Sequence, residues 1–236
     1  MKLSIIIPVY NEKTTILTVL EQINELNLYD NCEKEIIIVD DNSFDGTKEL
    51  LKNAEKKQKF DNCRYIYKEK NSGKGDSQRI AIPMCSGDFT IIQDADLEYN
   101  IKNINDLLKL LVENNFDAVF GFRKLKNVKF FSLYFVFHRI AVMTLTILTN
   151  ILYLSKIKDV ATCYRLIKTS ILKELKINGK GFEYDFSMIT KLLKKTKNIG
   201  QIQIEYNNRS FKEGKKNTWI VGFYAIKRIL LDRFVD

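Results

Sequence analysis

The sequence predicts an α/β fold with a Rossmann-like, mostly parallel central sheet flanked by helices. Short aliphatic runs alternate with segments of helical periodicity between residues 3 and 120. Polar clusters at residues 10–12, 40–45 and 94–98 each follow directly after one of these runs. Parallel strands end at the same edge of a sheet, where α/β proteins bind their ligands, so we expect these clusters to form one site.

The first elements are predicted by the spacing of their apolar residues. Residues 3–9 and 35–39 are almost wholly aliphatic, which is typical of strands buried on both faces. Between them, Ile16, Val19, Leu20 and Ile23 recur at helical spacing and predict a helix over residues 14–26. A loop rich in Asn, Ser and Gly then leads to a helix that runs to about residue 57, followed by a strand at 63–67.

Further elements follow in the same alternation. Gly73 and Gly75 flank Lys74 at the start of a helix, where glycines let the backbone approach a polar ligand. The spacing is not that of a Walker loop, so the sequence does not indicate a P-loop NTPase. Pro83 is expected to shorten or kink this helix. Strands are predicted at 88–93 and 118–120, and helices at 104–113 and 186–193.

Asp94 and Asp96 stand one residue apart at the end of the predicted strand 88–93. Side chains alternate along an extended backbone, so these two carboxylates should point the same way. Such a pair suits a hard divalent cation, Mg²⁺ or Mn²⁺, with coordination positions left open for phosphate oxygens. The alternative is an aspartate-rich turn that merely closes the strand.

Composition narrows the classes of partner and site. The formal net charge of +9 implies an anionic partner, which is a nucleic acid, a phosphorylated substrate or an acidic membrane surface. The four cysteines show no Cys-x-x-Cys spacing, and the chain has a single histidine. We therefore expect reduced thiols in a cytosolic protein, and neither a zinc site nor a disulfide framework.

Several motifs together identify a family. They are SIIIPVYNE (4–12), IVDDNSFDGT (38–47), GKG (73–75) with Arg79, QDADLEY (93–99), TCYR (162–165), GFEYD (181–185) and YNNRSFKEGKK (206–216). With these motifs the chain resembles family 2 glycosyltransferases of the GT-A fold. The resemblance is to the branch of dolichol-phosphate mannose synthases and polyprenyl-phosphate glycosyltransferases, and it covers about residues 3–230.

The resemblance implies a role for each matching residue. Asp94 and Asp96 would bind the metal that bridges the donor diphosphate, with Glu98 as a third ligand. A second group would bind the nucleotide sugar, and in it Asp41 would accept a hydrogen bond from the base. This group consists of Pro8, Tyr10, Glu12, Asp41, Lys74, Asp94, Arg123, Arg209 and Lys215. Arg209 and Lys215 belong to a late basic segment for which a solvated lysine face is the alternative interpretation.

The expected reaction is an in-line displacement, with inversion, that moves a hexose from a UDP-glucose or GDP-mannose type donor. Asp96 is assigned a catalytic role through the metal. A polyprenyl phosphate acceptor is already anionic and needs no strong base. A glycan hydroxyl would need one, for which Glu183 and Asp185 are the candidates if burial raises their pKa. Alternatively, these two are the acidic first turn of a helix.

Two apolar stretches predict contact with a membrane. Residues 130–154 are aliphatic and aromatic, but His138 and Arg139 leave only 140–154 uninterrupted, less than the roughly 20 residues that span a bilayer. Residues 219–234 mix apolar and basic side chains, as in a helix at an anionic membrane surface, although a core-facing helix has the same spacing. We therefore expect no transmembrane anchor. The expected location is peripheral, at the cytoplasmic face of a membrane, with a membrane-embedded partner as one means of attachment.

The predicted division places the catalytic domain at residues 1–215 and an amphipathic helix, on the core or at the membrane, at 216–236. A competing hypothesis is a non-catalytic module that binds a nucleotide or nucleic acid. Basicity alone suggests it, no basic strand with interleaved aromatic residues supports it, and it leaves the paired aspartates unexplained. We therefore expect no nucleic-acid partner.

Overall fold

The computed structural model of the chain describes residues 1–125, 133–207 and 219–235. Arg209 and Lys215 lie outside the described residues, so their predicted roles stay predictions.

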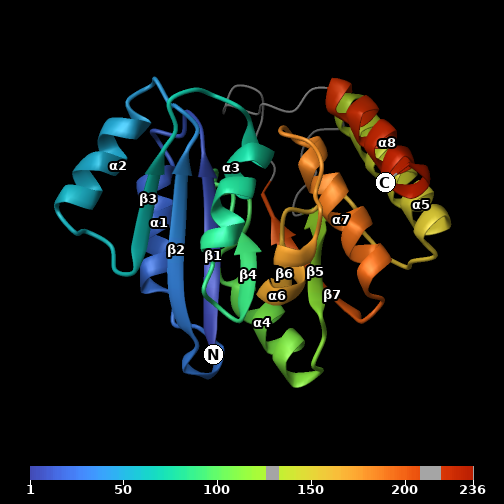
Figure 1. The fold of residues 1–236 in the computed structure, drawn as a ribbon, viewed down its shortest axis with the longest axis horizontal. Helices are drawn as coiled ribbons and strands as arrows, with labels where there is room; N and C mark the ends of the chain where they lie inside the picture. The colour runs from blue at the N-terminus through green and yellow to red at the C-terminus, as the bar shows by residue number, and fades with distance from the viewer. Residues whose placement is uncertain (126–132, 208–218, 236) are drawn as a thin grey trace.

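A seven-stranded sheet, in the order β3-β2-β1-β4-β6-β5-β7, runs through the molecule (Figure 1). Strands β1, β2, β3 and β4 are mutually parallel, and β5 is parallel to β7, whereas β6 is antiparallel to both of its neighbours. The sheet is therefore mostly parallel, as expected. The strands are β1 (Lys2–Val9), β2 (Glu33–Asp40), β3 (Cys63–Tyr67), β4 (Phe89–Ile92), β5 (Ala118–Leu125), β6 (Arg165–Lys168) and β7 (Ile199–Tyr206).

Helices cover both faces of the sheet, because its central strands carry apolar side chains on both sides. One face packs on α1, α2 and α4, and the opposite face packs on α3 and on α5 through α8. Figure 1 shows α2 at one end of the sheet, with α5 and α8 side by side at the other end. The helices are α1 (Ile16–Glu25), α2 (Thr47–Lys56), α3 (Lys74–Ala81), α4 (Asn103–Glu113), α5 (Leu133–Tyr153), α6 (Thr169–Glu174), α7 (Glu183–Lys195) and α8 (Trp219–Phe234).

The predicted elements of the first half are present, with shifted ends. Helix α3 ends at Ala81, and Pro83 lies in the 3-10 turn that follows, as its missing N–H group requires. Helix α7 begins at Glu183, three residues before the predicted start at 186, so Glu183 and Asp185 form its acidic first turn. Strands β6 and β7 and helix α6 were not predicted from the sequence.

Helix α8 is fastened to α7 by a buried charge network. Asp232 is fully buried and accepts hydrogen bonds from Thr190 Oγ1 (2.6 Å) and from Arg228 (2.6 Å). Ala225 and Ile229 of α8 pack into the same apolar core as α7. The boundary predicted at residue 216 stays a prediction. Among the helices that the structure describes, none combines the length and the apolar character needed to cross a bilayer.

Glu35 fastens the amino end of β2 to the turn before β4. Its carboxylate accepts hydrogen bonds from Ser4 Oγ (2.5 Å) and from the backbone N–H groups of Ser86 and Gly87. Burial raises the pKa of Glu35, but these hydrogen bonds, with those from Ser86 Oγ and Lys2, outweigh burial and hold the pKa at about 2. The folded state therefore favours the ionised carboxylate.

We expect Glu35 to make the fold sensitive to acid. Its pKa is lowered on folding, so its stabilisation is complete above the ordinary value of 4.5 and disappears as the pH falls towards 2. This shift in pKa corresponds to a contribution from Glu35 on the order of 3 kcal/mol to the free energy of unfolding. Urea unfolding at several pH values should show that Glu35→Gln is less stable than wild type at pH 7 and loses less stability than wild type between pH 4.5 and 2, because only the contribution of Glu35 is removed. A wild-type acid dependence retained in the variant would contradict this assignment.

Candidate active site

A cavity of about 790 Å³ opens at the carboxyl ends of β1, β2 and β4. The parallel register brings these ends together, since Val9 pairs with Asp40 and Ile6 pairs with Ile92. Most of the predicted site residues line this cavity, although they come from separate parts of the sequence. They are Pro8, Tyr10, Glu12, Asp41, Lys74, Asp94, Asp96, Glu98, Arg123 and Asp185.

The turn after β1 is held by the turn after β2. Asn11 adopts a positive φ of 50°, its N–H donates to Ser43 Oγ (2.9 Å), and its side-chain oxygen accepts from the N–H of Phe44 (3.0 Å). The N–H of Glu12 donates to Thr47 Oγ1 (2.9 Å). These bonds fix Tyr10 and Glu12 at the rim of the cavity.

Asp41 holds the glycine-lysine loop against the sheet. Its carboxylate accepts hydrogen bonds from the N–H groups of Ser72 (3.0 Å) and Gly73 (2.8 Å), and it pairs with Lys68 at 2.5 Å. Gly73 has a φ of +97°, which an L side chain rarely adopts. The predicted contact of Asp41 with a nucleoside base stays a prediction, and here the carboxylate orients the loop that carries Lys74.

Lys74 lies at the centre of the polar end of the cavity. Its Nζ is 2.6 Å from Asp94 Oδ1, 3.5 Å from Asp185 Oδ2 and 3.2 Å from Cys163 Sγ. Burial lowers the pKa of Lys74, but the charges of Asp185 and Asp94 outweigh it and raise the pKa well above its usual value. Lys74 is therefore a charged ammonium group at neutral pH.

The three predicted metal ligands do not form a ready-made cluster. Asp94 pairs with Lys74, Asp96 Oδ1 accepts the N–H of Glu98 (3.2 Å), and Glu98 Oε2 accepts the hydroxyl of Tyr206 (2.6 Å). No group of three or more His, Cys, Asp or Glu side chains arranged to hold a metal ion occurs within the described residues. Two carboxylates on one cavity wall nevertheless fit a cation whose remaining ligands come from phosphate and water.

The expectation that burial raises the pKa of Glu183 and Asp185 is wrong. Burial does raise the pKa of Asp185, but the nearby charges of Lys74 and Arg165 outweigh it, and the pKa is lowered. For Glu183, burial is outweighed by hydrogen bonds from the backbone N–H groups of Lys180 (2.9 Å) and Gly181 (3.1 Å), which also lower the pKa. Glu183 is not among the residues that line the cavity. Its carboxylate closes the turn that starts α7.

Arg165 was given no role from the sequence, yet it lies at the floor of the site. It is 1% exposed, and its guanidinium donates to the carboxylate (2.7 Å) and the backbone oxygen (2.6 Å) of Asp185. Gln78 donates to the same carboxylate at 3.2 Å. The TCYR motif was the only signal for Arg165, because the antiparallel β6 that delivers it was not predicted.

Arg123 reaches the cavity from β5 already paired. Its guanidinium makes a two-bond contact with Asp159, at 2.7 and 2.9 Å, and stacks over the ring of Tyr206 with 5.1 Å to the ring centroid. Tyr99 stacks on Tyr164 beside it at 4.5 Å between centroids. The predicted contact of Arg123 with the nucleotide sugar stays a prediction, and the pairing with Asp159 gives this wall a fixed shape.

The far end of the cavity is apolar. It is lined by side chains of α5, α7 and α8, which pack on one another, whereas Asp94, Asp96 and Glu98 follow β4. The polar end and this apolar end belong to one continuous space. The apolar lining residues are Phe137, Ala141, Val142, Leu145, Phe186 and Val221.

Residues 4–176, most of the chain, match the model of glycosyl transferase family 2. The chain belongs to this family. The mostly parallel sheet with flanking helices is accordingly the GT-A fold, as the resemblance implied. Glycosyl transfer is the chemistry of the family, and the chain is accordingly a glycosyltransferase.

Among its relatives, this family 2 chain is 30% identical to an uncharacterised protein of Methanocaldococcus jannaschii over 214 residues, which are 87% of this chain and 89% of that protein. It is 32% identical over 129 residues to the dolichyl-phosphate beta-glucosyltransferase of Dictyostelium discoideum, covering 51% and 39% of the two chains. Identity to the dolichol-phosphate mannosyltransferase of Pyrococcus furiosus is 26% over 194 residues, covering 81% and 53%. The chain thus spans about half or less of the length of these two enzymes.

Solved structures share the fold of this family 2 chain at low identity. Glucosyl-3-phosphoglycerate synthase from Mycobacterium tuberculosis, crystallised with Mn²⁺, UDP and glucosyl-3-phosphoglycerate, superposes with a TM-score of 0.70 at 19% identity, covering 98% of this chain and 79% of that one. The TarS protein of S. aureus, in complex with UDP-GlcNAc, gives a TM-score of 0.65 at 18% identity, covering 98% and 66%.

Proposed function

We propose that the protein is an inverting, metal-dependent hexosyltransferase that moves a sugar from a UDP-glucose or GDP-mannose type donor to a polyprenyl phosphate. The observation that carries this proposal is the shape of the cavity. One end presents carboxylates and buried cations, which suits a diphosphate and a metal ion, and the other end is apolar. An acceptor with a phosphate head and a hydrocarbon tail matches both ends.

In the proposed mechanism Asp94 and Asp96 would hold Mg²⁺ or Mn²⁺, with Glu98 as a further ligand. The bound ion would supply charge neutralisation for the departing nucleoside diphosphate. Lys74 lies beside Asp94 and would contribute a second positive charge at the same diphosphate. Pro8, Tyr10, Glu12 and Asp41 line the part of the cavity proposed for the nucleoside.

The acceptor assignment is supported by the acidity of Asp185, the candidate base that lines the cavity. A phosphate oxygen is anionic at neutral pH and attacks without a base, whereas a sugar hydroxyl must lose a proton. Asp185 has a lowered pKa and is tied to Arg165 and Gln78, so it is a weak base in this setting. The dolichyl-phosphate and dolichol-phosphate relatives point to the same acceptor class.

A membrane-facing surface would bring the protein to such an acceptor. Helix α5 exposes Ile140, Met143, Ile147 and Ile151 at intervals of three or four residues, so they share one face of the helix. Helix α8, beside it, exposes an apolar stripe of its own at the same intervals, made of Phe223, Ile226, Leu230 and Phe234. We define these eight side chains as the apolar face. An apolar surface of this kind suits insertion between lipid headgroups.

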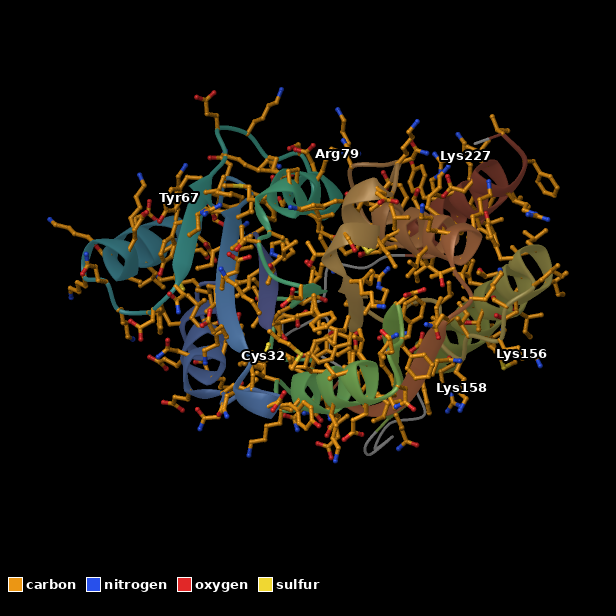
Figure 2. All side chains as sticks on the ribbon, turned by 60° about the horizontal axis from the view of Figure 1, so that its bottom comes forward. Cys32, Tyr67, Arg79, Lys156, Lys158 and Lys227 are labelled. Carbon is orange, nitrogen blue, oxygen red and sulfur yellow. The ribbon has the colours of Figure 1, made fainter. Side chains whose placement is uncertain are left out.

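Basic side chains lie on and next to the two helices that carry the apolar face. In α5, in the residues that follow it up to Lys158, and in α8, every exposed charged side chain that the structure describes is basic, and the one acidic group of α8, Asp232, is buried. Figure 2 shows Lys156, Lys158 and Lys227 at this end of the molecule. Their charge favours an anionic lipid surface, here proposed as the cytoplasmic face of a membrane. Attachment through a membrane-embedded partner is the other proposed means.

The direct test combines the protein with membranes, Mn²⁺ or Mg²⁺ and a panel of labelled UDP- and GDP-sugars. We expect label to appear in the organic-solvent extract as a glycosyl-phosphate lipid that mild acid hydrolyses. Label found only in water-soluble or polymeric glycan would refute the lipid acceptor and support the alternative, which is transfer to a hydroxyl of a surface glycan. Binding of UDP or GDP that depended on salt concentration and not on the metal ion would favour the non-catalytic module that binds a nucleotide or nucleic acid.

We expect Glu183→Gln to leave the rate of lipid glycosylation within about threefold of wild type, because Glu183 does not line the cavity and a phosphate acceptor requires no general base. The amide keeps an oxygen that can accept the N–H groups of Lys180 and Gly181, so the turn should be retained. Turnover at saturating donor and acceptor checks this. A loss of about 10²- to 10⁴-fold would instead identify Glu183 as a base and favour the hydroxyl acceptor.

A further inference from the structure

We infer that Lys74 is a displaceable cation that competes with the metal ion for Asp94 and thereby makes binding of metal and donor diphosphate cooperative. The inference rests on the proposed metal and diphosphate site. Its structural basis is the 2.6 Å contact between Lys74 Nζ and Asp94 Oδ1, at a position where both side chains are largely buried, with 14% and 16% of their surface exposed.

Competition follows from the geometry of the oxygen ligand. A divalent ion such as Mg²⁺ binds carboxylate oxygen at about 2.0–2.1 Å, and Lys74 Nζ already stands 2.6 Å from Oδ1 of the carboxylate that the ion would use. Both side chains are largely buried, so repulsion between two cations at Asp94 is screened less than it would be at an exposed position. The metal therefore gains Oδ1 of Asp94 only after the ammonium group has moved away from that oxygen.

The backbone around Lys74 is fixed, so the side chain alone would move. Asp41 holds the N–H of Gly73, and a Cβ on Gly75 would overlap the Cβ of Tyr184 in α7. The long side chain of Lys74 has a second carboxylate, Asp185, at 3.5 Å. A bound diphosphate would offer it a third anionic partner in the same cavity. Donor binding thus draws Lys74 from Asp94 and frees that oxygen for the metal.

Metal binding without any sugar transfer tests this inference. Free Mn²⁺ is measured by electron paramagnetic resonance, with and without UDP or GDP. We expect Lys74→Met to bind Mn²⁺ roughly tenfold more tightly than wild type in the absence of nucleotide, because the competing cation is gone. Lys74→Arg, which keeps the charge, should bind Mn²⁺ as weakly as wild type. Nucleotide should improve Mn²⁺ binding less in Lys74→Met than in wild type.

The matched control is Lys168→Met, which removes the same charge from an ion pair with Asp117 at the opposite edge of the sheet. It should bind Mn²⁺ as wild type does. Equal or weaker Mn²⁺ binding by Lys74→Met in the absence of nucleotide would overturn the inference, and so would an equal gain in Lys168→Met. If lipid is still glycosylated, either of these results refutes the inference and leaves the proposed function intact. If the Mn²⁺ affinities shift as expected but no lipid is glycosylated, the proposed function alone is refuted.

A second measurement uses the wild-type chain and does not depend on the folding of a variant. Reductive methylation followed by peptide mass spectrometry reports how accessible each lysine is. We expect Mn²⁺ alone to increase labelling of Lys74 relative to Lys168, and Mn²⁺ with UDP or GDP to reduce it again. Unchanged labelling of Lys74 on addition of saturating Mn²⁺ would overturn the inference.

Discussion

Asp96→Asn is expected to lower the rate of sugar transfer by at least about 100-fold, because it weakens the hold on the cation that stabilises the departing diphosphate. Asp96 lines the polar end of the cavity, one residue from its partner Asp94. The amide has nearly the same size, so folding should be unaffected. Initial rates with labelled donor and extracted lipid product measure the effect. Removal of divalent ions by EDTA should lower the transfer rate of wild type by a similar factor.

Asp61→Asn is the matched control for this substitution. It removes one carboxylate from an exposed position before β3, outside the set of cavity-lining residues, and should retain wild-type turnover. Thermal unfolding of both variants checks that neither is misfolded. Activity of Asp96→Asn within a few-fold of wild type, combined with indifference to EDTA, would contradict a metal-dependent mechanism.

The double variant Ile147→Asp with Ile151→Asp is expected to bind anionic vesicles roughly 100-fold more weakly than wild type. The two isoleucines are 50% and 67% exposed on the apolar face, so they can enter a lipid surface without unfolding. Each should contribute about 1–2 kcal/mol when its exposed surface leaves water, and about 3 kcal/mol in total corresponds to roughly 100-fold in affinity. Co-sedimentation with vesicles of phosphatidylglycerol and phosphatidylcholine measures the affinity of each protein for the vesicles.

A charge-matched control separates insertion from electrostatics. Gln22→Asp with Asn53→Asp adds two negative charges on exposed positions of α1 and α2, away from the end of the sheet where α5 and α8 lie (Figure 1). It should reduce vesicle binding only slightly, and less at higher salt. Equal losses in both double variants would show that net charge alone governs binding, and would remove the apolar face from the proposed function.

Local patterns were sufficient for the first half of the fold. The aliphatic run at residues 3–9 and the helical spacing of Ile16, Val19, Leu20 and Ile23 are set by burial on a period that is visible in the chain itself. The second half was harder to predict. Strand β6 has only four residues and is antiparallel to both neighbours, and a run that short does not reveal its partners or its direction.

The candidate site, like the fold, could be predicted from the sequence only in part. Because parallel strands end at one edge, the positions after β1, β2 and β4 could be expected together, and Asp41 and Asp94 do line one cavity. The electrostatics could not be anticipated. Whether a carboxylate gains or loses acidity on burial depends on which charges face it, and Asp185 faces Lys74 and Arg165, which are 111 and 20 residues away along the chain.

The amino-acid sequence by itself determined the α/β alternation, the family and the residue types at the polar end of the cavity, because these depend on neighbours within a few positions. Only the tertiary structure decided that Lys74 contacts Asp94, that Glu183 closes a turn, and that an apolar space continues from the carboxylates to α5 and α8. The physical reason is that ion pairing and burial are properties of groups in contact. Contacts between distant segments are created by packing of the whole chain.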